Sequence, residues 1–203
     1  MPYRSSVITE AKKRFHLWSS GSDPEAVHPN LRAAIFGINI SEGDRPEFER
    51  VKEEYFSTTS VDGKDICLST LARTKNPQLI IEYLDFIFSD SVATQDIHTG
   101  GAGVGSNTSL RHILWTYVRD NWQKVTKHLS GNNVVLDRFV RVSLPYFADE
   151  STEQDILSFF KDKDQSLFER GLATVLDAVH TNVQYKKRDE KVLLEWLQAH
   201  KYV

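Results

Sequence analysis

The sequence has almost none of the residues that build disulfide frameworks and cysteine-based metal sites. Among its 203 residues there is one cysteine, Cys67, so neither an intramolecular disulfide nor a cysteine cage for a metal can form within the chain. A chain of this kind fits a reducing compartment, and we expect a cytoplasmic location. Cys67 lies in a helical pattern, where a small buried hydrophobic residue is expected rather than a nucleophile.

Long apolar runs and an excess of one charge are also missing. No apolar run approaches the roughly 20 residues that span a bilayer. The 25 basic residues nearly balance 28 acidic ones, which leaves a net charge of −3. This balance gives no electrostatic reason to expect nucleic acid or an anionic membrane as a partner.

Sequence motifs for catalysis are absent as well. None of the seven histidines precedes a glutamate and no two stand four residues apart, so the H-E-x-x-H pattern of zinc proteases is missing. The glycine-rich stretch 100–105 lacks the Lys-Ser/Thr pair of a phosphate loop, and we expect a helix end and a turn before a capping Asn107. No G-x-S-x-G nucleophile elbow occurs. We therefore predict no catalytic residue and no metal in this chain.

Helical periodicity is what the sequence does contain. Apolar residues recur at i, i+3, i+4 and i+7, and no sustained alternation of period two predicts strands. The longest apolar stripe runs from Leu110 to Leu129. The predicted helices cover residues 5–19, 24–40, 46–57, 62–73, 77–88, 95–103, 108–129, 133–146, 152–161, 166–186 and 189–200.

Capping residues agree with several of these helix starts. Asp23-Pro24 and Asn76-Pro77 each offer a capping side chain followed by proline at the first helical position. Ser151 with Gln154, and Ser166 with Glu169, have the spacing of a capping box. No Pro/Gly/Ser-rich linker divides the chain. The sequence thus predicts one all-α domain over 1–203, an irregular superhelical array of antiparallel helix pairs.

Several short motifs, in a fixed order, resemble the C-terminal domain of the puromycin-sensitive group of zinc aminopeptidases. They cover essentially the whole chain, and the sequence departs from the family pattern at the glycine-rich stretch 100–105. The matching segments are Phe15-x-x-Trp18, Asp23-Pro24 with Val27-His28-Pro29-Asn30-Leu31-Arg32, Leu68-x-x-Leu71-Ala72-Arg73-Thr74 with Asn76-Pro77-x-Leu79, Gln95-Asp96-Ile97, Ser106-Asn107, Trp115-x-x-Val118-x-x-Asn121-Trp122, Asn182-Val183-x-Tyr185-x-x-Arg188-Asp189 and Glu195-Trp196-Leu197.

The resemblance implies a non-catalytic domain of HEAT- or armadillo-like helix pairs. This domain would close the peptide cavity of an aminopeptidase and contact the distal part of the substrate. Its partners would be the enzyme's own catalytic domain and peptide substrates. Zinc would belong to that catalytic domain, and no cofactor to this chain. In relatives an arginine at the end of the helix equivalent to 62–73 can hold a peptide carboxylate, and Arg73 is the matching position. A guanidinium can bind a carboxylate with two hydrogen bonds. The alternative is that Arg73 is only a cation at a helix C-terminus, where the helix dipole favours a positive charge.

One other function is compatible with the residues alone. A stand-alone helical-repeat scaffold that binds another protein would have the same periodicity. A Ser or Cys hydrolase has no supporting motif spacing.

Overall fold

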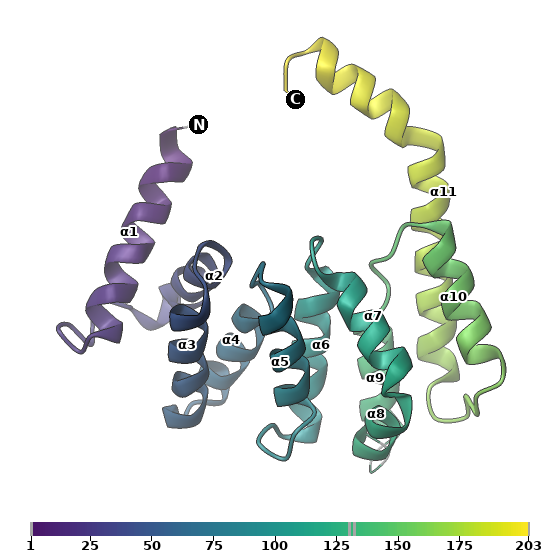
Figure 1. The fold of residues 1–203 in the computed structure, drawn as a ribbon, viewed down its shortest axis with the longest axis horizontal. Helices are drawn as coiled ribbons and strands as arrows, with labels where there is room; N and C mark the ends of the chain where they lie inside the picture. Colours follow the sequence, from purple (N-terminus) through teal and green to yellow (C-terminus); the bar gives the residue numbers. More distant parts are fainter. Residues whose placement is uncertain (1, 130, 132, 203) are drawn as a thin grey trace. The chain divides into compact units, whose positions relative to one another are not determined.

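The computed structural model describes residues 2–129, 131 and 133–202. Within them the chain forms α-helices, two short 3-10 helices and turns, without a strand, as Figure 1 shows. This confirms the predicted all-α class. The chain divides into two compact units, Met1–Asn121 and Trp122–Val203, while the assignment of 1–203 to a single domain stays a prediction. None of the described helices is both long enough and apolar enough to cross a membrane.

The first unit consists of short helices that pack on their neighbours in the chain. In it α2 packs on α1, α4 on α2 and α6 on α4, while α3 packs on α4 and α5 on α6 and α7, so that two rows of helices can be followed in Figure 1. This packing is compatible with the predicted helix pairs. The elements are α1 (Pro2–Ser19), η1 (Pro29–Leu31), α2 (Arg32–Glu42), α3 (Arg45–Ser57), α4 (Val61–Leu71), α5 (Pro77–Ile87), η2 (Thr94–Asp96), α6 (Ile97–Ser106) and α7 (Arg111–Asp120).

The core of the first unit lies between its two rows of helices. Phe36 of α2, Phe48 of α3, Leu68 of α4 and Tyr83 of α5 are each buried to 1% exposure or less. Burial on this scale is the main force that holds such helices together, since none is long enough to be stable in isolation. The buried hydroxyl of Tyr83 donates a hydrogen bond to the carbonyl oxygen of Leu68 at 2.6 Å, so this polar group is satisfied in the core.

The second unit contains α8 (Trp122–Leu129), α9 (Asn133–Ser143), α10 (Glu150–Lys161) and α11 (Glu169–Ala199). Helices α9 and α10 both pack on α11, and α8 packs on α9. An aromatic cluster joins the start of α8 to α10 and the turn before α11. The rings of Phe159, Phe160 and Phe168 lie 5.2–5.8 Å from that of Trp122 in edge-on geometry, the favourable arrangement for aromatic pairs.

The predicted helix 24–40 begins eight residues late, at Arg32. The carboxylate of Asp23 accepts a hydrogen bond from the N–H of Glu25, two residues on, so Asp23-Pro24 forms a turn instead of a helix start. The capping role falls to His28, whose ring nitrogen accepts the N–H of Asn30 ahead of the 3-10 helix that begins at Pro29. By contrast, Asn76 caps α5 as predicted and accepts the N–H of Gln78.

Neither predicted capping box in the second half of the chain forms. Helix α10 is capped by Asp149, which accepts the N–H of Thr152, two residues before the predicted cap Ser151. Helix α11 begins at Glu169 after Phe168, and the N–H of Ser166 donates instead to Asp164 in the preceding turn. In both places a nearby aspartate takes the backbone N–H, because a carboxylate is a stronger acceptor than a hydroxyl.

The predicted helix 108–129 is two helices, and the break between them lies at Asn121. This residue has φ −114° and ψ 25°, and both its backbone N–H and its side-chain amide donate to the carbonyl oxygen of Tyr117. Asn121 thereby ends α7, and α8 starts at Trp122. The apolar periodicity continues across the break because each helix buries one face, so the pattern alone could not reveal it.

The two helices predicted at 166–186 and 189–200 form one continuous helix, α11. The charged segment Lys186–Glu190 between them lies inside the helix. It contains neither glycine nor proline, and its residues are good or moderate helix formers. A run of charges in the absence of a breaker therefore does not end the helix.

The glycine-rich stretch lies within a helix as well. Helix α6 spans Ile97–Ser106, three residues beyond the predicted end at 103, and takes in all four glycines of the stretch. A Cβ atom on residue 100 would lie 2.6 Å from the hydroxyl oxygen of Tyr83, and one on residue 103 would lie 2.6 Å from Cβ of Ala72. Two of these glycines are therefore required by the close approach of α6 to α4 and α5.

We predict that Gly103→Ala destabilises the protein by about 1–3 kcal/mol, the usual effect of an added methyl group in a packed core. The new methyl group would collide with Ala72, whose Cβ cannot rotate away because it is bonded directly to the backbone. The measurement is the free energy of unfolding in guanidinium chloride. Gly131→Ala is the control, because a Cβ there meets open space, and equal stability of the two variants would contradict the close packing.

The single cysteine lies in the core of the first unit, as the sequence predicted. Cys67 of α4 is fully buried, and burial raises the pKa of its thiol to about 12. At pH 8 only about one thiol in ten thousand is then ionised, and the thiolate is the reactive form.

Cys67 is therefore expected to react with a disulfide reagent such as DTNB only after unfolding. We predict a slow, unfolding-limited reaction at pH 8 and a fast one in guanidinium chloride. A Ser20→Cys variant supplies an exposed reference thiol, which should react within seconds in the folded protein. A rapid reaction of DTNB with one thiol per molecule of the unmodified folded protein would show that Cys67 is accessible and would contradict this prediction.

Candidate functional site

Arg73 follows directly after α4, at the position that the sequence singled out. Helix α4 ends at Leu71 and its capping residue is Ala72, and the N–H of Arg73 donates to the carbonyl oxygen of Thr70 at 2.9 Å. The side chain is exposed and extends over α2, where a Cβ on Gly37 would lie 2.6 Å from Nη1 of Arg73. The absence of a side chain at Gly37 thus leaves room for the guanidinium group.

The backbone on both sides of Arg73 is fixed by Asn107, the residue that follows α6. The side-chain amide of Asn107 donates to the carbonyl oxygens of Ala72 and Thr74, both at 2.9 Å. The hydroxyl of the buried Thr74 in turn accepts the N–H of Asn76. The exposed guanidinium of Arg73 therefore projects from a backbone that is held from a second helix.

Two acidic residues pair with the residues that follow Arg73. Glu42 pairs with Lys75 at 3.1 Å, and Asp44 accepts a hydrogen bond from the side chain of Asn76 at 2.8 Å. Within the part of the chain that the structure describes, the side chain of Arg73 takes part in no hydrogen bond or ion pair. A permanent cation with five unused N–H donors is suited to bind a carboxylate from outside the domain.

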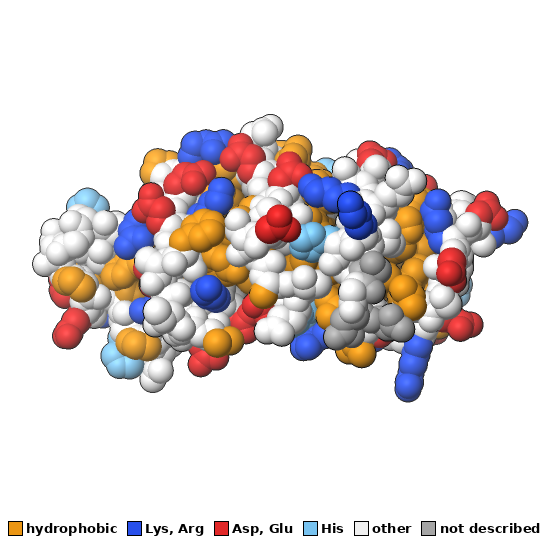
Figure 2. Space-filling model, turned by 90° about the horizontal axis from the view of Figure 1, so that it is seen from below, with side chains coloured by type: hydrophobic (Ala, Val, Ile, Leu, Met, Phe, Trp, Pro, Cys, Tyr) orange, Lys and Arg blue, Asp and Glu red, His pale blue; other side chains and the backbone are white. Residues whose placement is uncertain are grey.

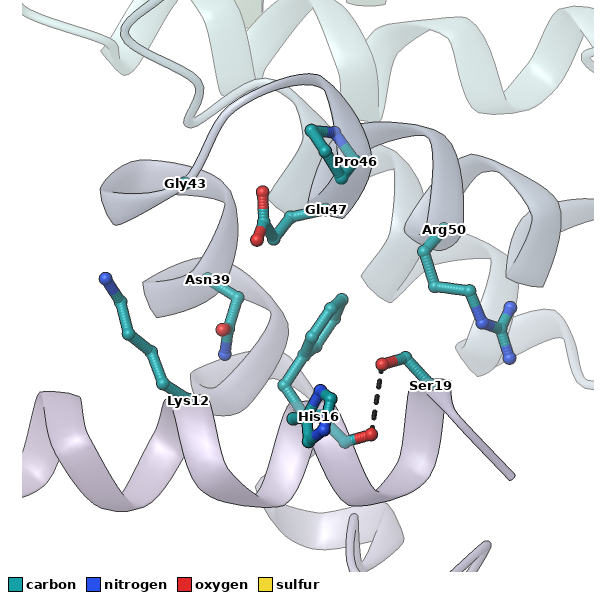
Figure 3. Close-up of a pocket in the computed structure, with 9 residues that line it drawn as sticks. Lys12, His16, Ser19, Asn39, Gly43, Pro46, Glu47 and Arg50 are labelled. Atoms are coloured by element: carbon teal, nitrogen blue, oxygen red, sulfur yellow. Dashed lines mark hydrogen bonds between the residues drawn. The ribbon is translucent and has the colours of Figure 1, made fainter. Parts of the chain in front are cut away.

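A separate cavity of about 520 Å³ lies between α1, α2 and α3. Figure 3 shows Lys12 and Arg50 on opposite sides of it, with Asn39 and Glu47 between them. Arg73 is not among its lining residues. These are Lys12, Phe15, His16, Ser19, Asn39, Gly43, Pro46, Glu47 and Arg50.

Several polar groups of this cavity already serve the fold. The carboxylate of Glu47 accepts the N–H of Asp44 in a capping box at the start of α3. The amide of Asn39 donates to carbonyl oxygens of α1 and α2, and the guanidinium of Arg50 lies 4.0 Å above the ring of Trp18. These contacts join the three helices, and they do not form a nucleophile–base pair, which covalent catalysis requires.

The described residues bring together no set of three or more His, Cys, Asp or Glu side chains that could hold a metal ion. One histidine pairs with an acid, and Nδ1 of His180 lies 2.7 Å from Oε1 of Glu153. His112 and His128, which both fall within the predicted helix 108–129, lie on α7 and α8. On the face seen in Figure 2, acidic and basic side chains alternate, and neither sign forms a continuous patch there.

The sequence singled out Arg73, whose contact with a peptide stays a prediction, but it did not indicate that Asn107 and Gly37 lie against this segment. Asn107 was expected to cap a helix start, and its side-chain oxygen does accept the N–H of Ser109; its amide in addition fixes the turn that follows α4. The signal for it was its place in the ordered family match, next to Ser106. Gly37 carried no signal beyond being a glycine in an otherwise apolar helix.

Comparison of the sequence with known proteins identifies the family of the chain. A profile described as the ERAP1-like C-terminal domain matches residues 3–181. The chain is 30% identical over 197 residues to aminopeptidase 2 of Candida albicans, and the match covers 97% of this chain and 21% of that protein. It is 28% identical to the mitochondrial aminopeptidase 2 of Saccharomyces cerevisiae, over 98% of this chain and 21% of that protein.

A more distant relative gives the same picture. Human aminopeptidase N is 24% identical over 186 residues, which are 90% of this chain and 19% of that protein. The chain thus spans about a fifth of the length of the curated relatives that it matches. Because the profile covers most of the chain and the relatives match almost all of it, the chain belongs to the family of ERAP1-like C-terminal domains found in aminopeptidases.

Proposed function

We propose that the chain is the non-catalytic C-terminal domain of a zinc-dependent aminopeptidase. In this function it closes the substrate cavity and contacts the distal part of a peptide whose N-terminal residue is removed elsewhere. Family membership supports the aminopeptidase part of the proposal. The zinc and the catalytic residues belong to the catalytic domain, which is also the principal partner of the chain.

The proposed contact with the substrate rests on the exposure of Arg73 and on its lack of a bonding partner among the described residues. Its guanidinium is exposed and unpaired among the described residues, and Asn107 holds the backbone on either side of it. A helix-end cation that served only the helix dipole would need no such support. Because the backbone that carries Arg73 is already held, only the side chain loses conformational freedom when it binds a carboxylate. The carboxylate that every unmodified peptide carries is the one at its C-terminus.

A cytoplasmic location and a HEAT-like superhelix are further parts of the proposal. The buried, unionised Cys67 is compatible with a reducing compartment. The succession of α2, α4 and α6 is compatible with stacked helix pairs.

The isolated chain, loaded with Zn²⁺, is expected to show no hydrolysis of fluorogenic aminoacyl substrates. The chain has no H-E-x-x-H motif to hold the metal and the attacking water. The assay should include the catalytic portion of the enzyme, alone and mixed with this chain. Cleavage restored on mixing supports the proposal, whereas chelator-sensitive cleavage by the chain alone contradicts it.

In the full-length enzyme, Arg73→Ala should raise KM for long peptides with a free C-terminal carboxylate by roughly tenfold or more. Loss of a hydrogen bond to a charged group costs about 1.5–3 kcal/mol, and each 1.4 kcal/mol corresponds to a factor of ten. The KM for aminoacyl amides, which do not reach the distal site, should be unchanged.

Peptides with an amidated C-terminus sharpen this comparison. Arg73→Ala should remove the difference in KM between free-acid and amidated peptides, and Arg73→Lys should keep part of it. Arg170→Ala, which removes an exposed arginine of α11, is the matched control. An equal effect of Arg73→Ala on peptides and aminoacyl amides would speak against a contact with the peptide C-terminus.

The alternative function is a stand-alone scaffold, and the coding sequence upstream of this chain distinguishes it from the aminopeptidase. An H-E-x-x-H segment encoded some hundreds of residues upstream in the same reading frame supports the aminopeptidase.

A further inference from the structure

The last helix extends well beyond the packed part of the second unit. In its first half α11 buries Leu172, Val175, Val179 and Val183 against α9 and α10. From residue 184 to residue 202 no described residue is buried. Figure 1 shows this part of α11 continuing past the end of α10. About 24 Å of helix, at 1.5 Å per residue over 184–199, thus buries no residue against its own unit.

This extension is rich in exposed apolar side chains. Of the thirteen large hydrophobic residues exposed in the described part of the chain, six lie between 185 and 202. Large apolar residues gathered on one exposed segment mark an interaction surface, whereas single ones are ordinary on any protein surface. The six are Tyr185 (54% exposed), Val192 (66%), Leu193 (48%), Leu194 (47%), Trp196 (50%) and Tyr202 (69%).

Most of these residues share one side of the helix. Tyr185, Val192, Leu193, Trp196 and the half-buried Leu197 fall within an arc of about 140° at 100° per residue, whereas Leu194 lies outside the arc, about 60° beyond Leu197. An arc of this width is typical of a helix that packs on a partner. The ring of Trp196 stacks on those of His200 and Tyr202, so its orientation is fixed from the C-terminal side.

The apolar side of the extension continues into a groove at its base. This groove has a volume of about 400 Å³, and Tyr185 and Leu193 of the extension form part of its wall. The other lining residues are Tyr146, Ala148, Asn182, Lys186 and Glu190. The groove and the arc together form one apolar surface, which we call the α11 face.

The size of the α11 face distinguishes between two possible partners, a second copy of the chain and another part of the same polypeptide. The arc of the extension, a helix side of about 24 Å by 10 Å, presents roughly a third of the 800 Å² per partner that a stable complex between separate proteins buries. A second copy of the chain would therefore gain too little area. A partner in the same polypeptide is already held at an effective concentration in the millimolar range, and a small apolar contact is then sufficient.

The relatives contain such a partner. The matches to the fungal aminopeptidases cover 97–98% of this chain, so they take in the extension, and about four fifths of each relative lies outside the match. We therefore propose that the α11 face docks in an apolar groove on the catalytic portion of the same polypeptide. This inference rests on the proposed function and names the surface through which the domain is held against its partner.

Amide hydrogen exchange, measured by mass spectrometry on the 203-residue chain and on the full-length protein, tests the docking. In the chain alone, amides of 184–199 should exchange rapidly. In the full-length protein the same amides should exchange at least about tenfold more slowly. Equal, rapid exchange in both proteins overturns the inference.

Two neighbouring leucines provide a matched pair of variants in the full-length protein. Leu193→Ser removes an apolar group from the α11 face and should restore rapid exchange in 184–199. Leu194→Ser changes a residue of nearly equal exposure outside the arc and should leave the slow exchange in place. The same loss of protection in both variants would contradict docking through the α11 face.

Further outcomes distinguish docking within the polypeptide from binding of a second copy, and from a failure of the proposed function. Concentration-dependent protection of 184–199 in the chain alone, with a doubled mass in sedimentation, would assign the face to a second copy and overturn the inference. Aminopeptidase activity with an unprotected extension overturns the docking and leaves the proposed function intact. Protection without aminopeptidase activity supports docking to the rest of the polypeptide and overturns only the proposed function.

Discussion

The first unit depends on the close approach of α6 to α4, which two glycines allow. With no side chains at Gly100 and Gly103, the backbone of α6 comes into contact with Tyr83 and Ala72. This approach brings Asn107, at the end of α6, within hydrogen-bond distance of the turn after α4. The orientation of Arg73 therefore follows from helix packing, and the local sequence around the arginine does not determine it.

Periodicity was sufficient to predict the helices because most of them bury one face and leave the other in water. It could not locate the break at Asn121, because α7 and α8 each bury one apolar face and the two stripes follow one another without a gap in the sequence. The opposite error occurred in α11, where a cluster of charges between 186 and 190 resembled a junction. Both cases have one physical cause: a helix ends where backbone N–H and C=O groups find other partners, and an apolar pattern contains no information on those partners.

The candidate site could be predicted only in part for a related reason. The chemistry of Arg73 can be read from its residue type, and family resemblance indicates its place at the end of a helix. The free space over Gly37 and the support from Asn107 arise from residues 36 and 34 positions away in the chain. Such contacts are tertiary, and no local pattern encodes them. Similarly, the exposure of Trp196 and its neighbours became visible only when the packing of the second unit was known.

The composition of α6 has a consequence for the order in which the first unit folds. Four of its ten residues are glycine, and each glycine lowers intrinsic helix stability by about 1 kcal/mol relative to alanine. This segment is therefore unstructured until α4, α5 and α7 provide the surfaces on which it packs. In a regular solenoid each repeat adds to a growing end. Here α6 packs on α4, α5 and α7 at once, so the stability of this glycine-rich helix depends on three neighbours rather than on one.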